Sequence, residues 1–188
     1  MRILGKTKKR IDRDVIEILT AELISITIGL IGGYLLARST NQLALLPGFL
    51  IMIPGFLEMQ GNILGSLAGR IGTALELKTI SKYLHWNTFI KDNLFASLII
   101  GCITALTLGV IAFLTTWLFF GQYSPSIILL TLIALIISLA IELPLTIIMT
   151  YWFYNHGYEP DDIMGPYVTT WADIISIAAL LLAFWVIL

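Results

Sequence analysis

Long apolar runs, separated by short polar connections, dominate the hydropathy pattern of the chain. These runs occupy residues 15–37, 43–69, 93–120, 126–154 and 163–188. An apolar run of about 20 residues is long enough for an α-helix to cross the ~30 Å hydrocarbon core of a bilayer. The pattern therefore predicts an all-α, polytopic membrane protein with five transmembrane helices in each protomer.

The amino-acid composition supports a membrane protein. Of the 188 residues, 58% are hydrophobic and 12% are charged, whereas soluble domains contain about 25% charged residues. The first apolar run exceeds the roughly 7 to 15 apolar residues of a secretory signal peptide and has no convincing small-residue cleavage site. We expect it to remain as the first helix, and we expect the chain to contact membrane lipid and no nucleic acid.

Lys and Arg are distributed unevenly between the connections. The basic segment 1–14 holds six of them and the amphipathic connection 70–92 holds four, against Arg38 alone on the opposite side. Cytoplasmic loops carry the excess of positive charge in membrane proteins. We therefore expect a cell-membrane protein with its N-terminus in the cytoplasm and, after five crossings, its C-terminus outside.

Two local patterns carry further structural expectations. The connection 70–92 has apolar residues on one helical face and Lys on another, which predicts a helix lying on the membrane surface. The run 43–69 contains Pro47, Pro54 and several glycines, so we expect this second helix to be kinked or locally unwound.

Carboxylates interrupt four of the apolar runs, and no Lys or Arg lies within the same apolar cores. They are Glu22, Glu58, Glu142 and Asp173. An ionisable side chain in the centre of a transmembrane helix costs at least roughly 2.5 to 3.5 kcal/mol, so such residues usually face a polar cavity. The missing positive charge indicates a transported cation. Glu22 is the weakest candidate because it lies only ~10 Å along its helix.

Asp173 is the deepest of these acids. It lies about ten residues into the last apolar run, ~15 Å along a helix and near the middle of the bilayer. Thr169, Thr170 and Ser176 fall on or near its helical face, which predicts a polar stripe that could hold an ion. The alternative is a protonated Asp that is hydrogen-bonded to a neighbouring helix.

Glu142 has a comparable polar stripe, which includes Ser138 and Thr146. Pro144 frees a backbone carbonyl one turn earlier, and a carbonyl beside an acid would suit a cation. The alternative is a structural role, in which Glu142 pairs with a Ser or Thr of another helix.

Glu58 and Asn62 lie one helical turn apart, so a carboxylate and an amide oxygen would point the same way. The alternative is helix packing, because Gly61, Gly65 and Gly69 form a ridge of small residues that would bring two helices close together. The two interpretations are compatible, since such a ridge would place the ligands beside a partner helix.

The available ligands favour a hard metal ion. His85 and His156 lie in connections, and Cys102 is the single thiol of the chain. Carboxylate, amide and backbone oxygens suit Mg²⁺, Ca²⁺ or Mn²⁺ better than Zn²⁺ or Cu⁺. A site with few carboxylates, which grips a partly hydrated ion, suits Mg²⁺ best.

Two segments resemble one known family. The first is Pro54-Gly55-Phe56-Leu57-Glu58-Met59-Gln60-Gly61-Asn62 with the following Leu67-Ala68-Gly69-Arg70, and the second is Gly165-Pro166-Tyr167-Val168-Thr169-Thr170 with Asp173. Both are similar to segments of the membrane domain of the MgtE family, the first especially to its eukaryotic solute-carrier relatives.

The resemblance implies a divalent-cation transporter with a preference for Mg²⁺, built as a homodimer whose pore runs near the two-fold axis between the second and fifth helices. Asp173 would be the central ion-binding carboxylate, and Asn62 with the Gly61 region would line the pore. Thr169 and Thr170 belong to the matching motif. Glu58 replaces a small residue of the family pattern and would add a ligand, and we expect no counterpart of the family's cytosolic Mg²⁺-sensing domains.

Two other functional classes fit the sequence less well. A proton- or sodium-coupled secondary transporter of another small solute could use the same acids, but the helices offer few groups besides Thr and Ser to bind that solute. An intramembrane aspartyl protease needs two Asp, and Asp173 is the only one deep within a helix. We therefore predict a transporter that is not an enzyme, has no resident cofactor, and carries Mg²⁺ as its substrate.

Overall fold

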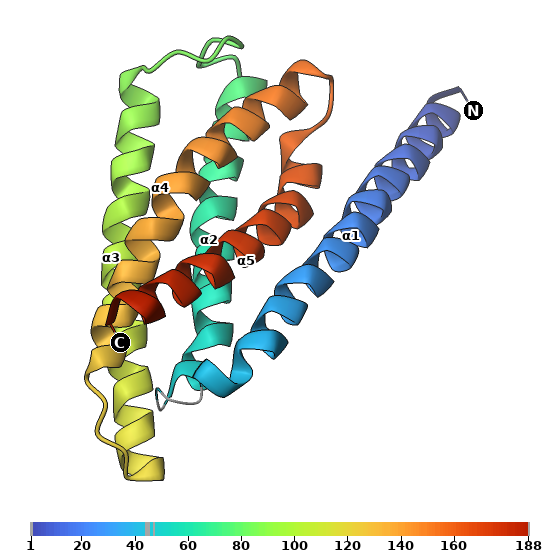
Figure 1. Cartoon of the computed structure of the whole chain (residues 1–188). Coiled ribbons are helices and arrows are strands. Elements are labelled where there is room, and N and C mark those ends of the chain that lie inside the picture. The colour runs from blue at the N-terminus through green and yellow to red at the C-terminus, as the bar shows by residue number, and fades with distance from the viewer. Residues whose placement is uncertain (1, 44–45, 47, 188) are drawn as a thin grey trace.

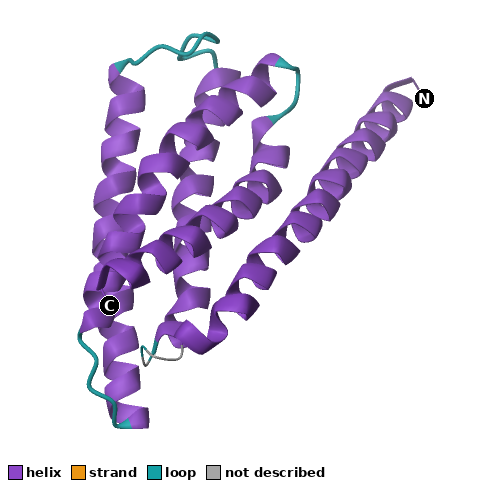
Figure 2. Cartoon of the chain, viewed as in Figure 1, coloured by secondary structure: helices purple, strands orange, loops and turns teal. Residues whose placement is uncertain are grey.

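The structure, a computed structural model, describes residues 2–43, 46 and 48–187, with the side chains of 2–14, 17, 40–43, 161 and 162 left out. It contains five helices (Figure 1): α1 (Arg2–Leu43), α2 (Phe49–Glu76), α3 (Thr88–Phe120), α4 (Ser126–Asn155) and α5 (Pro160–Ile187). The described residues form no β-strand (Figure 2). The predicted all-α fold is confirmed.

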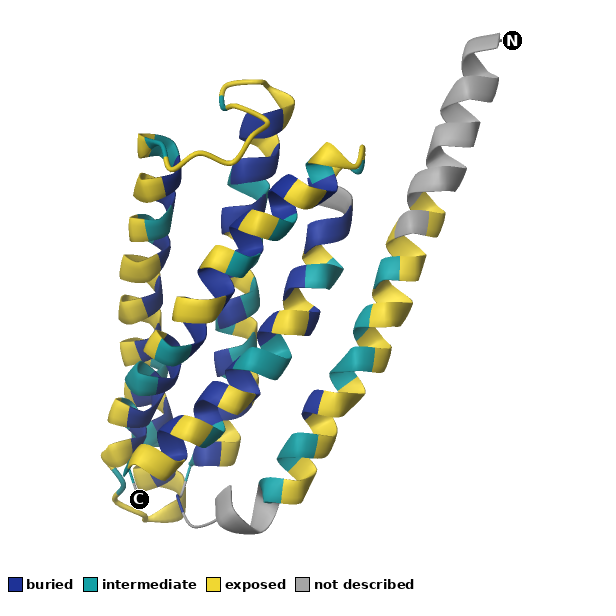
Figure 3. Cartoon of the chain, turned by 45° about the horizontal axis from the view of Figure 1, so that its top comes forward, coloured by how far each residue is buried: buried dark blue, intermediate teal, exposed yellow. Residues whose placement is uncertain are grey.

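Helices α2 to α5 form a bundle in which α2 packs against all three of the others. Helix α4 also packs against α3 and α5. The α2 side chains Phe49, Met52, Phe56, Leu67 and Ile71 are completely buried. Helix α1 packs mainly against α5 and leans away from the bundle toward its N-terminal end (Figure 1). Most of the described side chains of residues 15–31 are therefore exposed (Figure 3).

Four of the helices are long and apolar enough to cross a membrane by length and composition. Among the described residues these spans are Ile18–Ser39, Thr88–Phe120, Ser126–Asn155 and Ile163–Ile187. Helix α2 is less apolar because it contains Glu58, Gln60, Asn62 and Arg70. Since α2 has three helical neighbours, these polar residues lie in a helix with protein on several sides.

The second helix and the connection after it differ from expectation. Helix α2 is continuous through Pro54, so the predicted unwinding is wrong. It also runs on to Glu76, and residues 77–87 contain no helix, so the predicted surface helix is absent. Lys78 has a φ of 56°, a left-handed conformation that does not propagate an α-helix.

Helix α3 packs closely against α4 through a row of small residues, whereas the glycine ridge of α2 does not form such a contact. The buried face of α3 carries a small residue at every fourth position, including Ser97, Gly101, Ala105 and Gly109. A Cβ atom on Gly109 would lie 2.9 Å from the backbone Cα of Ile128 on α4. Small residues permit close packing in membranes, where van der Waals contact drives helix association.

The glycine ridge of α2 remains open within one protomer. Neither Gly65 nor Gly69 has a neighbour within 4 Å of an added Cβ atom among the described residues. The expectation that these two glycines bring helices together is therefore wrong for the helices of a single protomer.

Candidate ion-binding site

The candidate site lies where α2 and α5 meet on the side of the bundle away from the core. A Cβ atom on Gly61 would lie 3.5 Å from Cγ2 of Thr169, so the two helices are in contact at this level. Glu58 lies one helical turn before Gly61 on α2, and Asp173 lies one turn beyond Thr169 on α5, so both acids belong to the turns next to this contact. Glu58 is exposed and Asp173 is partly buried. The fold thus brings two carboxylates from different helices to one face.

Asn62 shares this face with Glu58. Its side-chain Nδ2 donates a hydrogen bond of 3.1 Å to Oε1 of Glu58. The amide oxygen of Asn62 therefore stays available as a ligand, and the second carboxylate oxygen of Glu58 does too. Among the described residues, the structure shows no hydrogen bond from another helix to the carboxylate of Asp173. The choice between an ion-binding and a protonated Asp173 stays a prediction.

A polar groove of about 410 Å³ extends from Glu58 and Asn62 along the interface of α2 and α3. Arg70, which sequence analysis put in a connection, lies in α2 and is the only basic side chain among the described residues that line the groove. Its Nε donates to the Ser66 carbonyl at 3.0 Å and its Nη2 to Oγ of Ser97 at 3.5 Å. Glu58 lies twelve residues before Arg70, ~18 Å along a helix, so the basic and acidic ends of the groove are well separated.

The two threonines of the α5 motif face different surroundings. Thr169 is exposed on the side of Gly61, and its Oγ1 donates to the carbonyls of Gly165 and Pro166 at 3.2 and 3.0 Å. Thr170 is buried, donates to the Pro166 carbonyl at 2.7 Å, and lines a crevice between α1, α4 and α5. The structure therefore brings Thr169 to the candidate site and separates Thr170 from it.

Glu142 lies inside the bundle, with 2% of its surface exposed. Its Oε1 accepts a hydrogen bond of 2.9 Å from Oγ of Ser176 on α5, and its Oε2 accepts one of 2.9 Å from Nε2 of Gln60 on α2. Gln60 Nε2 also donates to Oγ of Ser138 on α4. The structural alternative for Glu142, pairing with a hydroxyl of another helix, is the arrangement that the structure contains.

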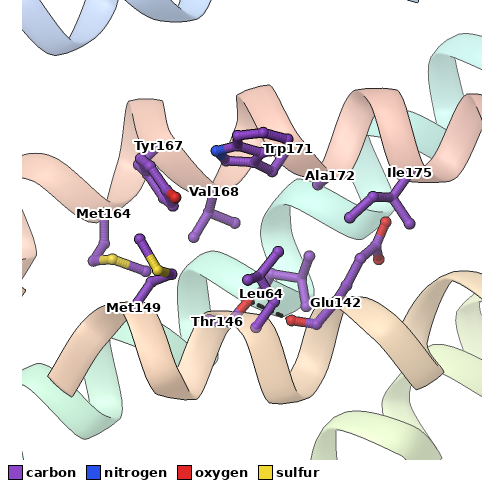
Figure 4. A pocket seen from close by; sticks show the side chains of 11 residues that line it. Leu64, Glu142, Thr146, Met149, Met164, Tyr167, Val168, Trp171, Ala172 and Ile175 are labelled. Carbon is purple, nitrogen blue, oxygen red and sulfur yellow. Dashed lines mark hydrogen bonds between the residues drawn. The ribbon is translucent and has the colours of Figure 1, made fainter. Parts of the chain in front are cut away.

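The cavity beside Glu142 is small. Figure 4 shows Glu142 at one end of a cavity between α4 and α5, with Met149 and Met164 at the other end. The cavity volume of about 10 Å³ is near the minimum of ~10 to 15 Å³ for one water molecule. Pro144 and Ala140 are exposed while Glu142 faces inward, so the acid and the carbonyl that Pro144 frees do not form the expected pair.

The remaining candidate ligands lie apart from this face. Glu22 is exposed on α1, and Cys102 is exposed on α3. Nδ1 of His156 lies 2.7 Å from the Trp152 carbonyl, at the end of α4. Among the residues that the structure describes, no three His, Cys, Asp or Glu side chains gather closely enough to hold a metal ion. One protomer thus offers two carboxylates and an amide, and not a closed metal cage.

Gln60 was not among the residues singled out from the sequence. Its side chain is completely buried beside Glu142 and Ser138, and its Oε1 is the one buried side-chain oxygen or nitrogen without a hydrogen-bond partner in the described part of the chain. Its position in the sequence was a usable signal. Gln60 lies two residues from both Glu58 and Asn62, and residues two apart point to different faces of a helix. A glutamine on that other face of an apolar run therefore indicates a polar partner in the interior.

Fold and site together define a polytopic helical membrane protein with an acidic intramembrane face. The family model of the MgtE divalent cation transporters matches residues 53–183, which is more than half of the chain. The protein therefore belongs to the MgtE family, which is a family of transporters and not of enzymes, and divalent cations are its substrates. No curated protein and no solved structure gave a match.

Proposed function

We propose that the protein transports Mg²⁺ across the cell membrane through a pore on the two-fold axis of a homodimer. The observation that carries the proposal is the face on which Asp173, Glu58 and Asn62 lie together beside Gly61 and Thr169. These residues present carboxylate and amide oxygens, which are ligands of Mg²⁺, Ca²⁺ and Mn²⁺. Asp173 is the central ion-binding residue, and the others line the path.

The open surface of α2 supports a homodimer. Gly65 and Gly69 continue the line of Gly61 along the helix and have no described neighbour within 4 Å in one protomer. Small residues allow two transmembrane helices to approach closely. A second copy placed against this face would double the carboxylates to four, and it would enclose an ion that a single protomer leaves exposed.

The number and type of ligands favour Mg²⁺ over Ca²⁺. Ca²⁺ takes six to eight oxygen ligands, whereas Mg²⁺ keeps several of its waters and binds through one or two carboxylates. Asp173 and Glu58 supply that number in each protomer. Glu142 is not proposed as a ligand, because both of its oxygens accept hydrogen bonds in the core.

The distribution of charge favours a cytoplasmic N-terminus. The positive residues of the chain are concentrated in 1–14 and 70–92, which fits a cytoplasmic location for both segments. At a membrane potential of 100 mV, a divalent cation moving inward gains about 4.6 kcal/mol, twice the ~2.3 kcal/mol of a single charge. A passive pore would need no other source of energy.

Uptake of ions into proteoliposomes tests the proposal. We expect the wild-type protein to admit Mg²⁺ in preference to Mn²⁺, Ca²⁺ and Na⁺, and Asp173→Asn to abolish uptake while the detergent-purified protein keeps its helical content and oligomeric size. Asp92→Asn is the matched control, because Asp92 is an exposed acid of α3 that lies outside the groove. Undiminished uptake by Asp173→Asn would remove Asp173 from the pathway. Uptake that follows a proton or sodium gradient, and not the Mg²⁺ gradient, would favour a coupled secondary transporter instead.

A further inference from the structure

We infer that Glu142 is a positioning residue that holds the α2 half and the α5 half of the ion site in register from inside the bundle. The inference rests on the proposed function of the Asp173 face. It concerns a residue that does not touch the ion, and it predicts an effect on ion selectivity that ordinary core packing would not produce.

The carboxylate of Glu142 connects the two helices that carry the ion ligands. On α2 it is bonded to Gln60, which immediately precedes Gly61 and Asn62. On α5 it is bonded to Ser176, which lies one turn beyond Asp173. Each oxygen takes one of the two bonds, at 2.9 Å in both cases. A single rigid group on α4 therefore fixes the distance between the two sets of ligands.

The environment makes these bonds strong. Gln60 and Ser176 are completely buried and Glu142 is 2% exposed, so water does not compete for the donors. A low local dielectric strengthens hydrogen bonds between buried groups. Ser138 also contacts Gln60 Nε2, which holds the amide in place from the same helix as Glu142.

A loosened connection would affect Mg²⁺ more than Ca²⁺. Mg²⁺ requires a near-ideal octahedral geometry, whereas Ca²⁺ accepts variable distances and coordination numbers. If α2 and α5 separate or rotate when the bonds to Glu142 are lost, the arrangement of Glu58 and Asp173 becomes less defined. The expected result is a lower preference for Mg²⁺, with the protein still folded and still conducting.

We expect glutamine at position 142 to keep the hydrogen bonds that connect α2 and α5, and leucine to lose them. In Glu142→Gln the new amide oxygen can accept from Ser176. If the Gln60 amide turns by 180°, the new amide NH₂ can donate to Gln60 Oε1, which has no partner in the wild-type protein among the described residues. Both connections survive without the charge. In Glu142→Leu both are lost, although the volume is similar.

The test measures Mg²⁺ and Ca²⁺ uptake by proteoliposomes containing Glu142→Leu, Glu142→Gln, Ser176→Ala and Gln60→Leu. We expect the ratio of Mg²⁺ to Ca²⁺ uptake to fall by at least about threefold in Glu142→Leu and to stay near the wild-type value in Glu142→Gln, because Ca²⁺ tolerates irregular geometry. Ser176→Ala and Gln60→Leu remove one connection each and should give intermediate ratios. Thr150→Val is the matched control, since Thr150 is equally buried on α4 but bonds to its own helix, at the Thr146 carbonyl.

Two outcomes would overturn the inference. An unchanged ion ratio in a folded Glu142→Leu protein, or in both single-connection variants if Glu142→Leu does not fold, would show that Glu142 does not position the site. Loss of all transport in Glu142→Gln with wild-type folding would instead make the charge of Glu142 essential, as expected for a direct ligand.

A distance measurement separates this inference from the proposed function. Spin labels at exposed positions Thr73 on α2 and Ala178 on α5, in a Cys102→Ser background, report the separation of the two helices by pulsed electron paramagnetic resonance. We expect a broader or shifted distance distribution in Glu142→Leu than in Glu142→Gln. If the wild-type protein takes up no divalent cation, the proposed function fails, while this measurement still supports or refutes the connection.

Discussion

Replacing Gly109 by alanine tests the close packing of α3 against α4. The added methyl group would lie 2.9 Å from Cα and 3.5 Å from the carbonyl oxygen of Ile128, and it would also meet Oγ1 of Thr131. Because two of these atoms belong to backbone, a side-chain rotation cannot relieve the overlap, and the helices must move apart. Overpacking of this kind costs about 1 to 3 kcal/mol.

The intrinsic preference of alanine for helix offsets part of that cost. Alanine is about 0.8 to 1.0 kcal/mol more favourable than glycine in a helix interior. We therefore expect Gly109→Ala to lower the free energy of unfolding by up to about 2 kcal/mol, because the gain in helix propensity offsets only part of the cost of the overlap. Reversible unfolding by sodium dodecyl sulfate in mixed micelles, followed by circular dichroism, measures this quantity.

Gly33→Ala provides the matched control for this measurement. Gly33 lies inside α1, is exposed, and has no described atom within 4 Å of an added Cβ. Its substitution should leave the free energy of unfolding unchanged or raise it slightly. If Gly109→Ala is as stable as Gly33→Ala, the approach of α3 to α4 at this position is looser than the structure indicates, and the role given to the small residues of α3 is wrong.

Two further substitutions test the acidic face and a helix terminus. Glu58→Gln removes one of the two carboxylates of the candidate site. We expect half-maximal uptake in proteoliposomes to need a several-fold higher Mg²⁺ concentration, with the maximal rate less affected. An unchanged dependence on Mg²⁺ concentration would exclude Glu58 as a ligand. Asn87→Ala removes the cap of α3, whose Oδ1 accepts a hydrogen bond of 2.9 Å from the Ile90 backbone N–H. Loss of such a cap costs about 0.5 to 2 kcal/mol, so the melting temperature in detergent should fall, and no change would show that α3 does not depend on this cap.

The helices could be predicted from the sequence because the length of an apolar run is a direct requirement of the bilayer. The position of the α2 C-terminus could not, because the segment after Arg70 continues the helical pattern and ends at Lys78 through a backbone conformation that its residue type does not indicate. The surroundings of Glu142 could not be predicted either. Its polar stripe with Ser138 and Thr146 is visible in the sequence, but the pattern does not reveal whether the stripe faces an ion path or the interior of the bundle, where all three residues are buried.

The acids within the apolar runs could be identified from the sequence, but the sequence did not show which of them lie inside the bundle and which lie on its surface. Glu58, Glu142 and Asp173 all interrupt apolar runs in the same way. Their different surroundings depend on which residues lie opposite: Glu142 is hydrogen-bonded to Gln60 and Ser176 of other helices, whereas Glu58 accepts from Asn62 of its own helix. Such pairings arise from tertiary packing between segments distant in sequence, so they cannot be predicted from the pattern of a single helix.

The two polar faces of α2 explain why the least apolar helix of the bundle packs against three others. Gln60 points inward to Glu142, while Glu58 and Asn62 point to the groove, so alternate residues of α2 face the interior and the groove. A helix surrounded by lipid could not satisfy the inward polar group, because lipid offers no hydrogen-bond partner. Placing α2 between its neighbours lets Glu142 and Ser138 of α4 accept from Gln60 and leaves Glu58, on the opposite side, open to the groove. The consequence is a helix that is fixed on one side and presents a carboxylate and an amide to the groove on the other.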